Sequence, residues 1–367
     1  MLDPTLHDSF GARWTEVNGV PIPMSYGDPV AEYRALRETV AVIDLSSRGR
    51  LCLVGSDRAK FLHGQLTNDI LQLKEGQGCY AAIVNAKAKM ESDAFVWALR
   101  DELLLDLEPG LSEHVSNRLE KFIIAADVQI VDAAPSYSLL ALQGPRVQDA
   151  IDSLELGSPC PAEDLRLIKI EHPVLGELYL ARLDRFGCPS FDLFVPTDSF
   201  PILLRKAITA SQHLGGRLVG WQAWETVRIE AGIPRFGLDM DASNLPPEAG
   251  LQSRAISTTK GCYTGQEVLA RIRTYGQVAK ALRGLRFDDP TTPVPEQGAK
   301  LYLGEREVGF VTSSVLSPKL GSPIALGYVR REANKLGTRL VLRNGSNDSS
   351  VVVTALDGLL THPLDGL

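Results

Sequence analysis

The chain has 367 residues, more than one hydrophobic core usually organises, so we expect two or three domains. Hydrophobic residues make up 44% and charged residues 23%, a balance typical of soluble globular proteins, and no apolar run is long enough to cross a bilayer. The net charge of −7 argues against direct nucleic-acid binding by the whole chain.

The cysteine and histidine patterns argue against a disulfide framework and against a metal-binding site. The five cysteines are widely separated and contain no Cys-x-x-Cys pair. The six histidines form no metal-ligand spacing such as His-Glu-x-x-His. We therefore expect a cytoplasmic protein with no disulfide framework, no metal site and no membrane contact.

The N-terminal segment, residues 1–49, is predicted to pack with the α+β core that follows it. Residues 21–26 are rich in proline and should be extended. Residues 29–39 should form a helix, because apolar side chains recur there at helical spacing. A short strand and a turn are expected over residues 42–49.

The middle of the chain indicates a structural repeat. Residues 51–55 and 138–144 are each an apolar strand that ends at a glycine and opens a helix. Each is followed by further strands and a helix, which predicts two α+β units over residues 50–135 and 136–280. The expected helices cover residues 57–66, 112–125, 145–154, 199–213 and 221–231. The expected strands are 80–85, 92–99, 103–107, 128–131, 165–170, 177–183 and 190–195.

The last quarter of the chain changes character. Residues 287–295 contain three prolines and two aspartates and have the composition of a stiff linker. Beyond them, short apolar strands alternate with turns rich in Gly, Pro, Ser and Asn, which predicts a small all-β domain over residues 281–367, a barrel. Its expected strands are 300–303, 307–313, 325–329, 339–342 and 351–355.

One thiol has a conspicuous setting, between two glycines and ahead of a predicted helix. The stretch reads Lys260-Gly261-Cys262-Tyr263-Thr264-Gly265-Gln266-Glu267. Free N–H groups at a helix N-terminus and the nearby positive charge of Lys260 would favour a thiolate at Cys262. The alternative is a small buried cysteine in a turn.

This octet closely resembles the signature of the YgfZ family, which is related in fold to the T-protein, the aminomethyltransferase of the glycine cleavage system. Three further stretches resemble the T-protein pattern. The first is the Pro-x-x-Tyr that ends at Tyr26. The second is residues 85–96, in which Asp93 matches an aspartate beside the folate. The third is Arg228-Ile229-Glu230-Ala231-Gly232.

The resemblance implies a fold and a function. The fold would be a T-protein-like three-domain cloverleaf of class α+β, with two ferredoxin-like α+β units and a small C-terminal β-barrel around a central cavity. Tetrahydrofolate or a derivative would be bound through Asp93, Arg228, Tyr26 and Glu230, and Cys262, Asp93 and Lys260 would be the catalytic or functional groups. The role would be to assist iron-sulfur cluster assembly or repair in client enzymes, including tRNA-modifying ones, so client or assembly proteins are expected partners.

Two alternatives stay open. One is a tetrahydrofolate-dependent aminomethyltransferase, and the other is a scaffold that binds only proteins. Two departures from the T-protein pattern predict low aminomethyl transfer: Ser92 replaces the first aspartate of an acidic pair, and Cys188 stands where a glutamate grips the pterin. A solvated strand end for Asp93 and a surface salt bridge for Arg228 are the simpler interpretations of those two residues.

Overall fold

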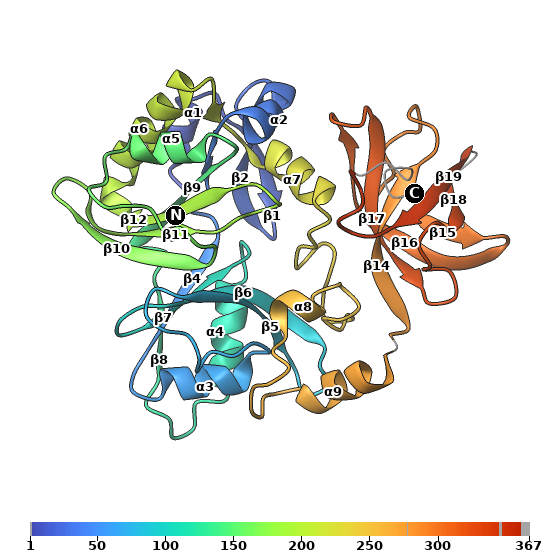
Figure 1. Cartoon of the computed structure of the whole chain (residues 1–367), viewed down its shortest axis with the longest axis horizontal. Coiled ribbons are helices and arrows are strands. Elements are labelled where there is room, and N and C mark those ends of the chain that lie inside the picture. The colour runs from blue at the N-terminus through green and yellow to red at the C-terminus, as the bar shows by residue number, and fades with distance from the viewer. Residues whose placement is uncertain (1, 277, 345–346, 361–367) are drawn as a thin grey trace. The chain divides into compact units, whose positions relative to one another are not determined.

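The computed structural model describes residues 2–276, 278–344 and 347–360 (Figure 1). The chain forms two compact units, and it passes between them several times. Unit 1 comprises Met1–Ile83, Ser92–Trp224 and Ala255–Tyr263. Unit 2 comprises Val84–Glu91, Glu225–Arg254 and Thr264–Leu367. The division of the sequence into four segments at residues 49, 135 and 280 stays a prediction.

The first sheet has five strands in the order β5-β6-β7-β4-β8. Their bounds are β4 Gly49–Val54, β5 Gly78–Val84, β6 Met90–Ala98, β7 Leu103–Leu107 and β8 Gln129–Asp132. Helices α3 (Arg58–Gln65) and α4 (Ser112–Glu120) cover one face of this sheet, where their leucines join a buried cluster with alternate strand residues (Figure 1). Because side chains alternate across a strand, the other alternate residues face away from these helices.

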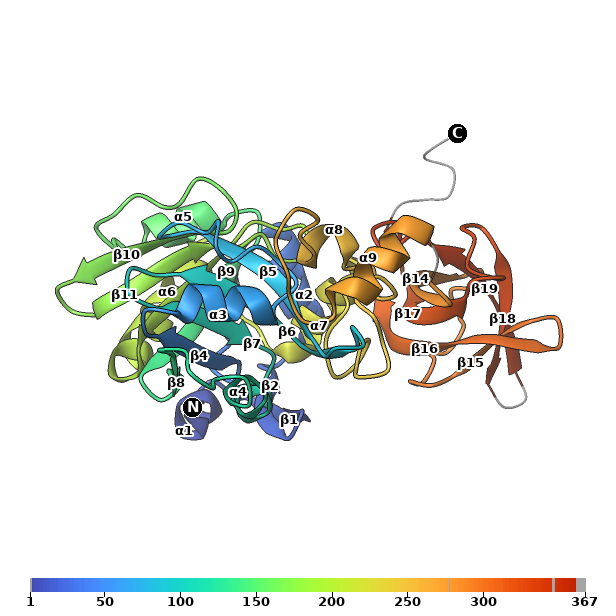
Figure 2. The ribbon, with the colours of Figure 1, turned by 90° about the horizontal axis from the view of Figure 1, so that it is seen from below.

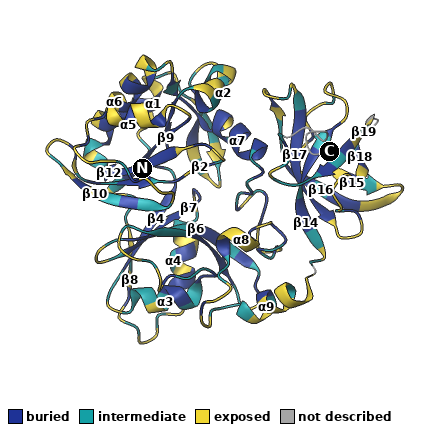
Figure 3. Ribbon diagram, in the orientation of Figure 1, coloured by how far each residue is buried: buried dark blue, intermediate teal, exposed yellow. Residues whose placement is uncertain are grey.

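The second sheet has six strands in the order β10-β11-β12-β9-β3-β13, and only the short β3–β13 pair is parallel. The bounds are β3 Ala41–Asp44, β9 Tyr137–Gln143, β10 Arg166–His172, β11 Gly176–Arg182, β12 Ser190–Pro196 and β13 Arg217–Leu218. Helices α5 (Val147–Asp152) and α6 (Phe200–His213) bury their apolar faces against it and leave their outer faces exposed (Figure 3).

The N-terminal segment is more structured than its sequence predicted. The expected helix is present as α2 (Pro29–Glu38), capped by the Asp28 carboxylate, which accepts a hydrogen bond from the Val30 amide. Ahead of it lie a short helix, α1 (Pro4–Asp8), and an antiparallel hairpin of β1 (Arg13–Val17) and β2 (Val20–Ser25). β2 is the extended segment expected over residues 21–26, whereas the sequence had not indicated α1 or β1.

Unit 2 contains a closed six-stranded barrel in the order β14-β17-β16-β15-β18-β19, so the predicted barrel is confirmed (Figure 2). The strands are β14 Lys280–Phe287, β15 Lys300–Leu303, β16 Arg306–Ser317, β17 Ser322–Arg330, β18 Arg339–Asn344 and β19 Asn347–Thr354. The pattern did not indicate β14, where basic residues and Gly284 interrupt the apolar ones. Gly284 is required there, because a Cβ atom would lie 2.4 Å from Thr354 Oγ1.

Three further α-helices are α7 (Trp221–Glu230), α8 (Gln252–Ala255) and α9 (Gln266–Tyr275), and a single 3-10 turn, η1 (Thr197–Ser199), precedes α6. In the described ranges, no helix combines the length and apolar character that crossing a membrane requires. The two mixed sheets with their helices, together with the closed barrel, confirm the predicted α+β class and C-terminal barrel.

Candidate functional site

A network of buried ion pairs links the two sheets of unit 1. Arg48, which precedes β4, donates from Nε to Asp106 Oδ1 at 2.6 Å and from a terminal nitrogen to Glu108 Oε1 at 2.5 Å. Arg185, in the loop between β11 and β12 of the second sheet, contacts Asp192 Oδ2 at 2.5 Å and Asp106 Oδ2 at 3.4 Å. All five side chains are at most 11% exposed. Each charge has an opposite partner, which is the condition under which burial of ionised groups is tolerated.

Asp93 lies beside this network, in β6 and on the sheet face that points away from α3 and α4. It is 8% exposed, so the alternative of a solvated strand end is wrong. Tyr80 Oη donates to Asp93 Oδ2 at 2.5 Å. Burial, and next the negative charge of Glu108, raise the pKa of Asp93 to about 6, while the Tyr80 hydrogen bond opposes the shift. A carboxyl group with this pKa can exchange a proton near neutral pH.

Two buried carboxylate oxygens near this network, Asp93 Oδ1 and Glu108 Oε2, have no hydrogen-bond partner within the described part of the chain. A third such oxygen, Asp69 Oδ1, lies 3.3 Å from His63 Nδ1, away from this network. A buried acceptor without a donor costs about 1–3 kcal/mol, so native proteins rarely keep one without a reason. Each of the two oxygens could accept a hydrogen bond from an N–H donor of a ligand.

Aromatic rings extend from Asp93 across to the second sheet. The Tyr80 and Phe95 ring centroids are 5.0 Å apart, and the Arg185 guanidinium lies 5.3 Å from the Phe95 centroid and 6.0 Å from that of Trp224. Phe186 packs edge-on against Trp224 at 4.9 Å and holds a positive φ of 55°, a backbone state that most residues avoid. Aromatic faces beside carboxylates suit a flat, polar heterocycle.

Tyr26 belongs to a second set of contacts in unit 1. Its hydroxyl is 2.6 Å from His7 Nδ1, and His7 Nε2 is 2.8 Å from Asp44 Oδ2. Burial, and next the charge of Asp44, raise the pKa of Tyr26 above its ordinary value. No contact joins Tyr26 to Asp93 among the described hydrogen bonds and ring pairs, so its predicted role in folate binding stays a prediction.

Lys260 is held by the end of helix α3. Its ammonium donates to the carbonyl oxygens of His63, Leu66 and Asn68 at 2.5, 2.7 and 2.8 Å, and it lies 4.6 Å from the centre of the Tyr263 ring. A helix C-terminus presents unpaired carbonyls and partial negative charge, which explains the attraction. Burial lowers the pKa of Lys260 to about 8. With three acceptors engaged, Lys260 holds the first residues of the octet, 260–263, within unit 1.

Cys262 is exposed and free, and it lies outside regular secondary structure, four residues before the start of α9. The alternative of a small buried cysteine is therefore wrong. Gly265 has a φ of +80°, and a Cβ atom there would lie 2.7 Å from the Asn85 carbonyl oxygen, so this glycine is required by the backbone. The predicted thiolate character of Cys262 stays a prediction.

Arg228 and Glu230 lie on α7 and are buried inside unit 2. Arg228 donates to Glu225 from two nitrogens at 2.9 and 2.5 Å, to Asp239 at 2.7 Å, to Ser313 Oγ at 3.0 Å, and to the Ile233 carbonyl. These contacts use all five N–H donors of a guanidinium. Glu230 accepts a hydrogen bond from Ser317 Oγ on β16.

The salt bridge predicted as an alternative for Arg228 exists, but it is buried and not on the helix surface. Neither Arg228 nor Glu230 shares a described contact with Asp93. Their predicted contacts with folate have no support from this geometry and stay predictions.

The two departures from the T-protein pattern have different surroundings. Ser92 is fully buried beside Asp93, and its hydroxyl donates to the Asp93 carbonyl oxygen at 3.2 Å. The Cys188 sulfur lies 3.9 Å from the Leu36 carbonyl oxygen and 3.8 Å from an Arg37 nitrogen, at the end of α2. Its described polar contacts are with α2 and none is with Asp93.

Sequence reasoning missed Tyr80 and Glu108, which interact with Asp93, and the chain of contacts that runs from Tyr80 through Phe95 and Arg185 to Trp224. Only Glu108 carried a signal, a charge at the end of an apolar strand, and that signal is common. The described residues contain no group of three or more His, Cys, Asp or Glu able to hold a metal ion.

Comparison with known protein families gives two matches that together span most of the chain. The GCVT N-terminal domain matches residues 5–260, and the glycine cleavage T-protein C-terminal barrel domain matches residues 280–356. The second match begins at the first residue of β14. The predicted relation to the T-protein superfamily is confirmed.

Individual relatives agree with this assignment. An aminomethyltransferase of Corynebacterium jeikeium is 28% identical over 350 residues, covering 90% of this chain and 89% of that protein. A putative chloroplastic transferase of Arabidopsis thaliana is 29% identical over 365 residues, covering 96% and 79%. The crystal structure of the glycine cleavage system aminomethyltransferase T from Bartonella henselae superposes with a TM-score of 0.86 at 23% identity, covering 96% of each chain, which shows a shared fold. The chain therefore belongs to the glycine cleavage T-protein family.

Proposed function

We propose that this protein binds tetrahydrofolate and transfers a one-carbon unit with its help. The observation that carries the proposal is Asp93, a buried carboxyl group with a pKa of about 6 and one oxygen that lacks a partner among the described residues. Several relatives named aminomethyltransferase support this kind of reaction.

The roles of the residues follow from their surroundings. Asp93 and Glu108 would accept hydrogen bonds from the N–H groups of the pterin, and the rings of Phe95 and Trp224 would pack on its faces. Asp93 is mostly ionised at pH 7, yet it is close enough to its pKa to take a proton from a folate nitrogen and return it. Arg48 and Arg185 would keep the site from accumulating negative charge.

The test is turnover of an aminomethylated carrier protein with tetrahydrofolate. We expect methylenetetrahydrofolate to form in the presence of this protein, and formation to fall by about tenfold or more in Glu108→Gln, because an amide cannot repeat the charge-assisted contact. Glu113→Gln, an exposed change on α4, serves as the control. If tetrahydrofolate binds but no product forms, the transferase proposal is wrong. That result would agree with the low aminomethyl transfer predicted from Ser92 and Cys188, and it would favour the second candidate, described next.

A second candidate is the YgfZ-type role, in which a folate-binding protein assists iron-sulfur cluster assembly or repair in client enzymes, including tRNA-modifying ones. The exposed Cys262 in its octet favours it, because the thiol is accessible and Lys260 anchors the loop that carries it. In this role the partners would be iron-sulfur client or assembly proteins in the cytoplasm. Cys262 would act as a nucleophile or sulfur ligand.

Cys262→Ser tests the second candidate. We expect the melting temperature to stay within about 2 °C, because an exposed side chain contributes little packing. The variant should lose the fastest iodoacetamide-reactive site and fail to restore iron-sulfur enzyme activity in cells that lack the protein. Cys160→Ser, at a half-buried thiol, is the control and should restore activity. Full rescue by Cys262→Ser would contradict a functional thiol.

A further inference from the structure

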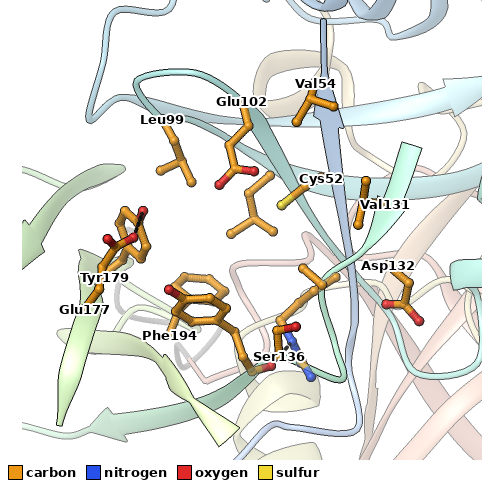
Figure 4. A pocket seen from close by; sticks show the side chains of 14 residues that line it. Cys52, Val54, Leu99, Glu102, Val131, Asp132, Ser136, Glu177, Tyr179 and Phe194 are labelled. Atoms are coloured by element: carbon orange, nitrogen blue, oxygen red, sulfur yellow. Dashed lines mark hydrogen bonds between the residues drawn. The ribbon is translucent and has the colours of Figure 1, made fainter. Parts of the chain in front are cut away.

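Unit 1 contains a cavity of about 190 Å³ that shares no lining residue with the Asp93 site (Figure 4). It lies between the two sheets, and its walls come from β4, β7 and β8 on one side and from β9, β11 and β12 on the other. Nothing in the proposed folate chemistry uses these residues. The volume is below the roughly 300–1,000 Å³ of pockets that take drug-sized ligands, so an occupant must be small.

One side of the cavity is aromatic. Tyr137, Tyr179 and Phe194 line it, and the Tyr137 and Tyr179 ring centroids are 6.2 Å apart at an interplanar angle of 58°. The opposite side is aliphatic, with Leu99 and Leu104 among its residues. Inclined aromatic rings present electron-rich faces, which attract cations within about 6 Å.

The charges at the cavity are mainly negative. Glu102, Asp132 and Glu177 all line it, and the Glu102 carboxylate points inward between Leu99 and Cys52 (Figure 4). Glu177 is neutralised by Lys169 at 2.6 Å and accepts a hydrogen bond from Tyr179 Oη at 2.6 Å. Glu102 has no such cation among the described ion pairs, and its described hydrogen-bond donor is the Cys52 thiol, a weak donor.

The one arginine of the cavity wall does not neutralise Glu102. Arg50 is fully buried, and its guanidinium donates to the carbonyl oxygens of Tyr137, Arg48 and Ser46 at 2.9, 2.8 and 3.0 Å. No ion pair between Arg50 and Glu102 occurs in the described structure. A carboxylate without a cation among the described ion pairs therefore faces a partly open, partly aromatic space.

We propose that this cavity binds a small organic cation, such as a protonated alkylamine or a quaternary ammonium ion, with Glu102 as its counter-ion. Tyr137, Tyr179 and Phe194 would receive the charged head, and the aliphatic wall would receive the alkyl part. An anion would meet the carboxylates of Glu102 and Asp132, for which the described ion pairs include no cation, and a neutral apolar molecule would desolvate Glu102 without compensation.

Calorimetric titration with tetramethylammonium and n-butylammonium chloride tests the proposal, with n-butanol and sodium butyrate as neutral and anionic probes of similar size. The wild type should bind at least one ammonium ion saturably and should not bind butyrate. Glu102→Gln should weaken that binding by about tenfold or more, and Tyr179→Ala by about three- to thirtyfold. Glu113→Gln, an exposed change on α4, should leave it unchanged.

Tyr179→Phe separates loss of the ring from loss of folding, because it keeps the ring and removes only the hydroxyl. It should bind within about threefold of the wild type, and all variants must keep a cooperative thermal transition. Three results would overturn the proposal: no saturable binding of either ammonium ion, equal binding of n-butanol, or undiminished ammonium binding by a folded Glu102→Gln variant. Tetrahydrofolate affinity should be unchanged in Glu102→Gln, so failure here is distinguishable from failure of the folate site.

Discussion

Replacing Asp93 by Asn should lower the affinity for tetrahydrofolate by about ten- to hundredfold and remove a pH-dependent stability penalty of about 3 kcal/mol. Affinity falls because a charge-assisted acceptor becomes a neutral amide whose nitrogen cannot accept. The hydrogen bond from Tyr80 can persist, because the Asn carbonyl oxygen accepts as the carboxylate does. The local structure should therefore survive the change.

The sign of the stability effect follows from the raised pKa. Asp93 has a pKa of about 6 in the folded protein, against about 3.9 in an unfolded chain, so the folded state binds the proton more tightly. The resulting stabilisation of the folded protein is fully present below about pH 4 and is lost as the pH rises through 6. Because Asn does not titrate, the stability of Asp93→Asn relative to wild type should rise between pH 4 and 7.

Denaturant unfolding of both proteins at several pH values, with calorimetric titration of tetrahydrofolate, measures the two effects. Asp101→Asn, an exposed change beyond the end of β6, is the matched control and should alter neither. A pH-independent stability difference would show that folding does not raise the pKa of Asp93. Unchanged folate affinity would remove Asp93 from the binding site.

Replacing Arg228 by Met should destabilise unit 2 by about 3–5 kcal/mol, the typical cost of removing one partner of a buried ion pair. The change removes the Arg228 guanidinium from both Glu225 and Asp239. Arg235 stays 3.4 Å from Glu225 and can offset part of that charge, whereas Asp239 has no second cation among the described ion pairs. It also removes the donor that links α7 to Ser313 in the barrel strand β16.

Thermal and denaturant unfolding would measure this loss. The control is Arg271→Met on α9, where an exposed pair with Glu267 at 3.8 Å should contribute less than about 1 kcal/mol. If Arg228→Met kept wild-type stability and lost only folate affinity, Arg228 would be a ligand contact, as the resemblance implied. The saturated hydrogen bonding leads us to expect the opposite.

Local sequence information was sufficient for most elements. The helix over residues 29–39 and the strand over residues 103–107 were recognised from apolar spacing, and both are present within one residue. The helix expected over residues 112–125 ends earlier, at Glu120, because the chain then makes tighter turns in which the Phe122 amide bonds the Leu119 carbonyl. Helix ends depend on such local competition, which apolar spacing does not encode.

The sequence by itself determined the α+β units, the barrel, and two residues with unusual settings, Asp93 and Cys262. Only the tertiary structure decided which charges meet. It pairs Arg48 with Glu108, occupies Lys260 with the carbonyls at the end of α3, and directs Cys188 toward α2. The physical reason is the distance along the chain over which each signal operates. Hydrophobic periodicity is a pattern among residues a few positions apart, whereas the partner of a buried charge lies on a strand or helix that is far away in sequence and is brought near only by packing.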